Sequence, residues 1–202
     1  MDLSRIALCL PGDIKTLIDK ELDAESEQTL IALINAFSEA CQRRDAMNRL
    51  LEKKTYTEYF DGDCRLIVVQ APPIVDDNTL AVYEDVERQF TTALVKYDDY
   101  SLLDNGENGA IKRLIGRFPY GAHIIKAVYN GGLVLNADGQ ITVPYDLRNA
   151  CAMQVSYWFK NRNDLGLQSI SMQSGTINLP NPSDFLLPVK KAILSYRHFR
   201  SF

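Results

Sequence analysis

The sequence predicts an α+β fold, in which a small helical bundle carries an inserted antiparallel β-subdomain and ends in an extended C-terminal tail. Apolar residues recur at three- and four-residue steps near both ends of the chain, which is the period of an amphipathic helix. Between residues 55 and 143 the period falls to two, and Asn-Gly and Asp-Gly pairs interrupt it, as in short strands joined by tight turns. Helices are therefore expected near 13–22, 24–53, 144–163 and 185–196. Residues 1–54 and 144–202 are expected to form the helical core with a C-terminal arm, and residues 55–143 the β-subdomain.

The helix expected at 144–163 has the clearest pattern. Pro144 suits a first helical turn, where a missing N–H costs nothing. The apolar side chains that follow fall on one face, which needs an apolar partner. The second helix supplies that partner, so the expected core consists of Leu30, Ile34, Phe37, Leu147, Cys151, Val155 and Trp158.

The start of the second helix is marked by Asp23, followed by Glu25 and Glu27, because acidic side chains favour a helix N-terminus. No Gly or Pro occurs between residues 42 and 54. The helix is therefore expected to continue to about residue 53, with a bend at the polar run 43–45.

The first two strands of the β-subdomain are expected to form a hairpin. The runs TYTEYF and CRLIVVQ flank Asp61-Gly62, a pair typical of tight hairpin turns. Further strands are expected at 79–86, 100–103, 110–114, 124–129 and 140–143. Their spacing favours an antiparallel meander or a small sandwich over parallel crossover units.

Composition places the chain among ordinary globular proteins, with 202 residues, 46% hydrophobic residues and a net charge of −4. No apolar run approaches the roughly 20 residues of a membrane span, and no secretory signal is expected from the opening residues. The body is acidic, which argues against broad nucleic-acid binding. Its cysteines, Cys9, Cys41, Cys64 and Cys151, form no C-x-x-C pair, so we expect free thiols in a reducing compartment.

A search for reactive groups yields no catalytic, cofactor or metal site. His123 and His198 lack partners at metal or triad spacing. The acidic pairs Asp61 with Asp63 and Asp76 with Asp77 lack the spaced oxygen ligands of a calcium loop, so turn chemistry is the favoured reading.

Two C-terminal segments are candidates for protein contacts. Residues 167–183 are uncharged, and we expect an arm that pairs with a neighbouring subunit by strand addition, with a mobile loop as the alternative. The arm residues concerned are Ile170, Met172, Ile177 and Leu179. The tail after Asp184 is basic and apolar without acidic residues, a pattern suited to an acidic, partly apolar groove on a partner. The alternative is that its apolar residues pack on the protein's own helices.

The order of several motifs resembles the head-tail connector, or adaptor, proteins of long-tailed bacteriophages. The resemblance begins with YTEYFDG at 56–62 and APPI at 71–74, and continues with VYNGGL at 128–133. It then covers the Val-Pro helix and the terminal segment, with matches at Val143, Pro144, Asp146, Leu147, Ala150, Tyr157, Trp158, Asn161, Arg162, Gly166, Pro188, Val189, Leu194, Tyr196 and Arg197. Residues 79–96 match it least.

The resemblance implies a non-enzymatic virion protein of the neck, present in the host cytoplasm during assembly. Such an adaptor forms a twelve-fold homo-oligomeric ring beneath the portal protein, carries the stopper or tail-completion protein, and lines a channel through which genomic DNA passes without sequence-specific binding. In that family the C-terminal segment reaches the portal, which points to Val189, Lys190, Lys191, Leu194, Tyr196, Arg197, Phe199, Arg200 and Phe202. The alternatives are a stopper or tail-completion protein, or a small cytoplasmic enzyme or binding module with a pocket in the β region.

Overall fold

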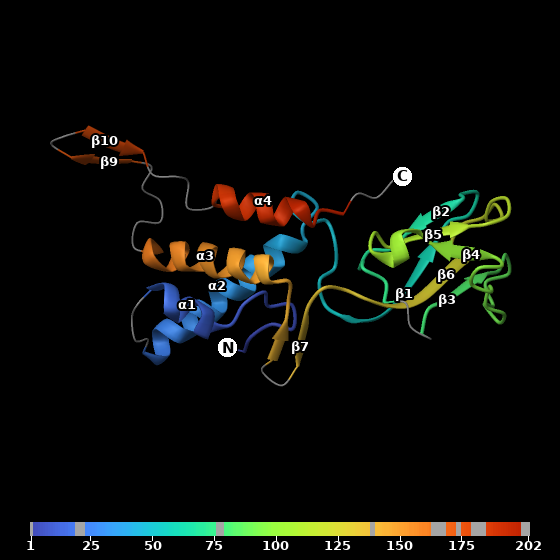
Figure 1. Ribbon diagram of the computed structural model, residues 1–202, viewed down its shortest axis with the longest axis horizontal. Helices are drawn as coiled ribbons and strands as arrows, with labels where there is room; N and C mark the ends of the chain where they lie inside the picture. The colour runs from blue at the N-terminus through green and yellow to red at the C-terminus, as the bar shows by residue number, and fades with distance from the viewer. Residues whose placement is uncertain are drawn as a thin grey trace. The chain divides into compact units, whose positions relative to one another are not determined.

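The computed structural model describes residues 2–18, 23–75, 79–137, 140–162, 169–172, 175–178 and 185–198 (Figure 1). The chain divides into two compact units. The helical unit comprises residues 1–48 and 134–197, and the β unit comprises residues 49–133 and 198–202. The predicted α+β class is confirmed.

Helix α3 is the centre of the helical unit, because it packs against each of the other three helices. The elements of this unit are α1 (Pro11–Ile18), α2 (Ala24–Gln42), α3 (Tyr145–Lys160), α4 (Leu187–Ser195) and a small hairpin of β7 (Leu135–Ala137) and β8 (Gln140–Thr142). The β7–β8 hairpin thus belongs to the helical unit, although the sequence analysis placed it in the β-subdomain.

The second helix is shorter than predicted. Asp23 caps its start by accepting the N–H of Ser26, but α2 ends at Gln42 rather than near residue 53. Arg43 adopts an extended conformation, and Asn48 has a φ of 54°, which an α-helix does not tolerate. The polar run 43–45 therefore marks the end of the helix and not a bend.

The apolar face of α3 meets that of α2. Leu30, Ile34, Phe37, Leu147, Cys151 and Val155 are buried there. Trp158 is an exception, because its ring is only partly buried. It makes an edge contact with Phe37, with the ring centroids 6.0 Å apart, at the margin of the core.

The β unit contains two three-stranded antiparallel sheets around one apolar core. The first has the order β1-β6-β3 and the second β2-β5-β4. Ile67 and Ile111 from the second sheet meet Val82, Ala127 and Tyr129 from the first in this core. The strands are β1 (Lys54–Phe60), β2 (Leu66–Val68), β3 (Ala81–Glu84), β4 (Tyr100–Leu102), β5 (Ala110–Arg113) and β6 (Ile125–Gly131), with a short 3-10 helix at Leu103–Gly106. This arrangement is a small sandwich and not a meander.

The predicted hairpin between β1 and β2 does not form. β1 pairs with β6, and β2 pairs with β5. The Gly62 N–H donates to the carbonyl of Gly121, and the Phe118 N–H donates to the carbonyl of Cys64. The backbone of the connecting loop is therefore bonded to residues 118–121, and the chain passes from one sheet to the other instead of turning back.

The β unit begins and ends side by side. The N–H of Leu133 donates to the carbonyl of Leu51 over 2.9 Å. The backbone approach here is close, because a Cβ on Gly132 would lie 2.1 Å from the carbonyl oxygen of Glu52. Two further strands, β9 (Ser169–Met172) and β10 (Gly175–Asn178), pair antiparallel in the segment between α3 and α4. Among the described residues, no helix is long and apolar enough to cross a bilayer.

Candidate interaction surfaces

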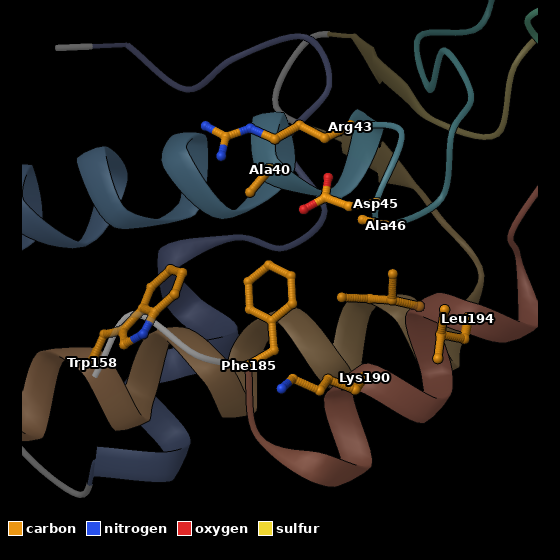
Figure 2. A pocket seen from close by; sticks show the side chains of 9 residues that line it. Ala40, Arg43, Asp45, Ala46, Trp158, Phe185, Lys190 and Leu194 are labelled. Carbon is orange, nitrogen blue, oxygen red and sulfur yellow. The ribbon is translucent and has the colours of Figure 1, made fainter. Parts of the chain in front are cut away.

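A groove of about 330 Å³ opens in the helical unit among α2, α3 and α4. Figure 2 shows the rings of Trp158 and Phe185 turned toward it, with Arg43 and Asp45 from the loop after α2 and Lys190 from α4 at its rim. Its apolar lining also includes Ala40, Ala46, Ile193 and Leu194. An apolar floor with charges of both signs at the rim is typical of a surface that binds a protein segment.

Trp158 lies at this groove because an aromatic cluster holds it there. The Phe185 ring makes an edge contact with Phe37 at a centroid distance of 5.3 Å and lies 6.2 Å from the Trp158 ring. Trp158 was predicted to lie in the core. Its partial exposure makes it a surface anchor as well as a core residue, and no sequence period distinguishes the two.

The described part of the C-terminal segment is bound to the protein itself. Val189 and Ile193 are buried, so Val189 is unavailable to a partner although it was predicted to dock. The Tyr196 hydroxyl donates to Asp146 over 2.8 Å. Exposed side chains on this segment include Leu187, Lys191, Leu194 and Arg197. The predicted docking residues Phe199, Arg200 and Phe202 lie outside the described residues, as does the arm residue Leu179.

His198 is the last described residue and belongs to the β unit. Its side chain is buried, and its Nε2 lies 3.0 Å from the carbonyl oxygen of Val69. His123, by contrast, is exposed, and its N–H donates to the Asp61 carboxylate. The Asp61 carboxylate therefore joins two loops that are distant in the sequence, and Asp76 and Asp77 lie outside the described residues. No three His, Cys, Asp or Glu side chains gather as a metal site within the part of the chain that the structure describes.

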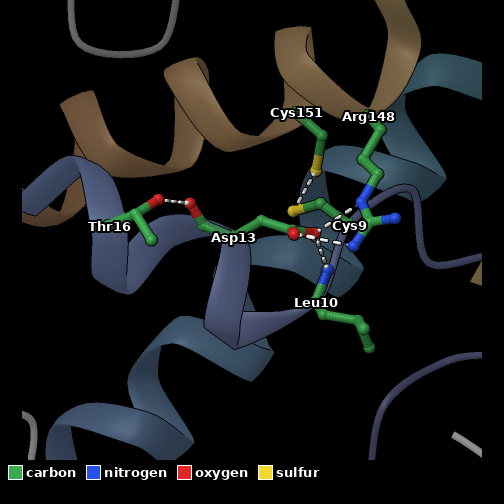
Figure 3. A network of polar contacts seen from close by, with 6 residues as sticks. All are labelled: Cys9, Leu10, Asp13, Thr16, Arg148 and Cys151. Carbon is green, nitrogen blue, oxygen red and sulfur yellow. Dashed lines mark hydrogen bonds and ion pairs between the residues drawn. The ribbon is translucent and has the colours of Figure 1, made fainter. Parts of the chain in front are cut away.

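A polar network joins α1 to α3 (Figure 3). The Arg148 guanidinium donates to both carboxylate oxygens of Asp13, at 2.8 and 2.7 Å, and the Leu10 N–H also donates to Asp13. Partial burial raises the pKa of Asp13, but the hydrogen bonds and charge of Arg148 and the Leu10 amide outweigh burial, so the pKa is lowered overall. This arrangement is a structural tie rather than a proton-transfer site.

Two buried thiols lie beside this network. The sulfur atoms of Cys9 and Cys151 are 2.9 Å apart. Burial raises the pKa of Cys151 well above its usual value, and the neighbouring Cys9 adds to the effect. Burial also raises the pKa of Cys41 to about 12. The thiols of Cys41 and Cys151 are therefore protonated near neutral pH and poor nucleophiles.

In the β unit, Glu58 of β1 is bonded to the segment that follows β2. Its carboxylate accepts the N–H of Gln70 at 3.0 and 3.2 Å and the hydroxyl of Tyr129, which in turn accepts the N–H of Ala71. Tyr56 stacks on Tyr129 at a centroid distance of 5.7 Å. Burial, followed by the charges of Glu52 and Glu58, raises the pKa of Tyr56 to about 12. These contacts fix one face of β1.

Comparison with known proteins identifies a shared fold. No family model matches the sequence, and no curated protein matches it. Three solved structures align with 100% of this chain. They are the neck of an empty GTA particle computed with C6 symmetry (TM-score 0.59, 13% identity, 95% of that chain), the neck of a native GTA particle computed with C12 symmetry (0.51, 17%, 98%) and the virion of a native gene transfer agent particle (0.55, 16%, 98%). The chain therefore has, over its whole length, the fold of chains that build gene transfer agent particles.

Proposed function

We propose that this protein is a structural, non-enzymatic component of the neck of a phage-like particle. The observation that carries the proposal is the extent of the fold match, since 100% of this chain and 95% of a GTA neck chain align. A match over both whole chains, including the two units, favours a shared architectural role over reuse of one common subdomain. The proposed location is the neck of the virion, with the host cytoplasm as the site of assembly.

More specifically, the protein is an adaptor that forms a homo-oligomeric ring beneath the portal protein, carries the stopper or tail-completion protein and lines the channel for genomic DNA. The necks that share its fold were computed with C12 and C6 symmetry, which supports a ring and suits a twelve-fold one. The motif order, from YTEYFDG at 56–62 to the terminal Tyr196 and Arg197, supports the adaptor position within the neck.

The portal-facing part of this adaptor is the exposed and basic C-terminal segment. Lys191 and Arg197 are exposed, and Arg200 follows them. Because Val189 is buried and Tyr196 bonds to Asp146, the contact depends on the last residues and on the exposed side of α4. An acidic, partly apolar portal surface would suit this segment.

An assembly experiment tests the proposal. Particles made without this protein should accumulate as DNA-filled heads without tails, and purified protein added to a lysate of such heads should restore joining. A truncation that removes residues 199–202 keeps the contacts of Tyr196 and His198 and should not restore it. A Leu17→Ser variant, changed at an exposed residue of α1, is the control and should act like the parent. Normal tailed particles in the absence of the protein would refute the neck role.

A further inference from the structure

We propose that the open edge of strand β1 binds the β9–β10 arm of a second copy of this chain, so that neighbouring subunits are joined by strand addition. The inference rests on the proposed function, because an adaptor ring brings identical copies side by side. It adds the receiving surface, which neither the sequence pattern nor the comparisons identify.

Strand β1 is the outer strand of its sheet, and its register identifies the backbone groups that point outward. The carbonyl of Asn130, the partner of Thr55, accepts the N–H of Val75 on the far side of β6. Since N–H and C=O directions alternate along a strand, the pair Thr55 with Asn130 is not hydrogen-bonded. The side chains of this pair are correspondingly close, with Thr55 Oγ1 2.6 Å from Asn130 Oδ1.

The same alternation applies along the strand. Thr57 and Tyr59, opposite Val128 and Lys126, must also direct their N–H and C=O groups away from β6. Among the described residues, none of the backbone groups of Thr55, Thr57 or Tyr59 has a backbone partner. The opposite edge of the sheet differs, because there the Leu94 N–H donates to Val82 of β3.

The outward-facing residues 55, 57 and 59 of β1 carry none of the usual protection against pairing. Natural edges are blunted by short strands, charges, prolines or bulges. β1 has seven residues in an unbroken ladder, and its solvent-facing side chains from 55 to 59 are Thr55, Thr57 and Tyr59, which are uncharged and exposed. Thr and Tyr are also among the residues that favour strands. Such an edge is suited to another strand.

The arm likewise offers strand edges that can pair with another strand. β9 and β10 pair only with each other in the described structure, so each retains one outer edge. A two-stranded hairpin is marginally stable alone, whereas a third strand allows a stable sheet. The arm sequence, SISM and GTIN, carries no charge, and its four-residue strands fit the length of the edge from 55 to 59.

The contacts of the helical unit show where the arm leaves its own copy. The Leu186 N–H donates to Gln154 and the Tyr196 hydroxyl to Asp146, so α4 runs antiparallel to α3. The arm therefore leaves at the C-terminal end of α3. The N-terminal end of α4, to which the arm returns, lies at the same end of the helical unit. The ring proposed above places a second copy beside this chain, and the β1 edge of that copy is the partner that we assign to the arm.

The test uses two complementary variants. Thr57→Pro removes an outward N–H without removing a bond to β6, and Thr57→Val is its control because it keeps that N–H. In the second variant, residues 169–178 are replaced by a short Gly-Ser linker. By native mass spectrometry the parent and Thr57→Val should form multimers, and each disabled variant should be monomeric. A mixture of the two should form 1:1 heterodimers, because only one intact arm and one intact edge remain.

A synthetic peptide of residues 167–180 provides a readout that does not depend on the folding of Thr57→Pro. It should bind the arm-deleted protein in fluorescence anisotropy and dissociate parent multimers. The inference would be overturned if multimers persist in both variants or if the parent is itself monomeric. It would also be overturned if the mixture of the two variants stays monomeric or if the peptide does not bind. Persisting multimers would leave the proposed neck function intact, whereas normal tailed particles without the protein would refute that function alone.

Discussion

The two units are stabilised in different ways. In the helical unit, side chains from α2 and α3 interlock and leave a groove beside Trp158. In the β unit, backbones approach one another so closely that several glycines have no room for a side chain. Polar groups also differ, since an ion pair joins α1 to α3, whereas in the β unit Glu58 and Tyr129 of the first sheet bond the backbone of Gln70 and Ala71, just after β2. The helical unit should therefore tolerate changes of surface shape, and the β unit should tolerate few changes of backbone volume.

The largest expected effect is that of Gly132→Ala. Gly132 has a φ of +104°, and a Cβ there would lie 2.1 Å from a backbone oxygen. Backbone strain and the overlap of the new Cβ with this oxygen both oppose the substitution. We therefore expect the free energy of unfolding to fall by more than about 4 kcal/mol and the β unit to unfold. Gly116→Ala is the matched control, because Gly116 also has a positive φ, +66°, but has open space around it, and it should cost about 1 kcal/mol. Chemical denaturation followed by tyrosine fluorescence measures both; equal losses would contradict the close-approach argument.

A second prediction compares two aromatic residues of the helical unit. Phe37→Ala should cost about 3–5 kcal/mol, as for a fully buried ring. Trp158→Ala should cost less, about 1–3 kcal/mol, because its ring is partly exposed. Far-UV circular dichroism during thermal unfolding gives the two melting temperatures. A Trp158→Ala variant that is as unstable as Phe37→Ala would place Trp158 back in the core.

The third prediction concerns acid stability. The pKa of Asp13 is lowered in the folded protein, so its contribution is present above the unfolded pKa of about 3.9 and is lost as the pH falls through the folded value. Asp13→Asn should therefore destabilise the helical unit by roughly 1 kcal/mol at pH 7, a modest value because the pair is partly exposed. The difference from the parent should shrink below about pH 4.

Lys15→Gln is the control for Asp13→Asn. Lys15 and Glu27 are 3.6 Å apart with both side chains more than 40% exposed, so their loss should change the melting temperature little. A difference between Asp13→Asn and the parent that is constant from pH 7 to pH 3 would show that the carboxylate charge does not contribute.

The last prediction, with the smallest expected effect, concerns the rates at which a reagent labels the four thiols, first in the parent protein. Cys64 of the β unit is partly exposed, and Cys9, Cys41 and Cys151 of the helical unit are buried. A thiol reagent should modify Cys64 first and the buried three only when the helical unit opens. In Gly132→Ala, labelling of Cys64 should accelerate while labelling of the others is unchanged. Equal acceleration of all four, measured by mass spectrometry, would show that the two units unfold together.

The sequence was sufficient to predict the class of each element but not the pairing of strands. The recurrence of apolar residues at three- and four-residue steps predicted α2 and α3 correctly, because burial of one helix face leaves a local pattern in the sequence. The β1–β2 hairpin was predicted wrongly, because the groups that Gly62 and Cys64 bond lie about 60 residues away and leave no local pattern. The end of α2 was predicted too late, because apolar residues continue at helical spacing after Arg43, where the backbone becomes extended.

The groove beside Trp158 could not be predicted from the sequence. The groove combines Ala40 and Ala46 with Phe185 and Lys190, which no spacing in the sequence brings together. Val189 was assigned to docking because a basic, apolar segment has the same composition whether it binds a partner or its own core. The open edge of β1 becomes visible only after its register with β6 is known.

The hydrogen bond between Leu133 and Leu51 has a consequence for how such a protein can be altered. A module that begins and ends at adjacent backbones can be exchanged for a short loop or for a different module, because closing a short gap costs little entropy. Among the described residues, the chain enters the β unit again at His198, so an exchange would also remove the contact of His198 with Val69 and leave the helical unit as a carrier for interchangeable inserts.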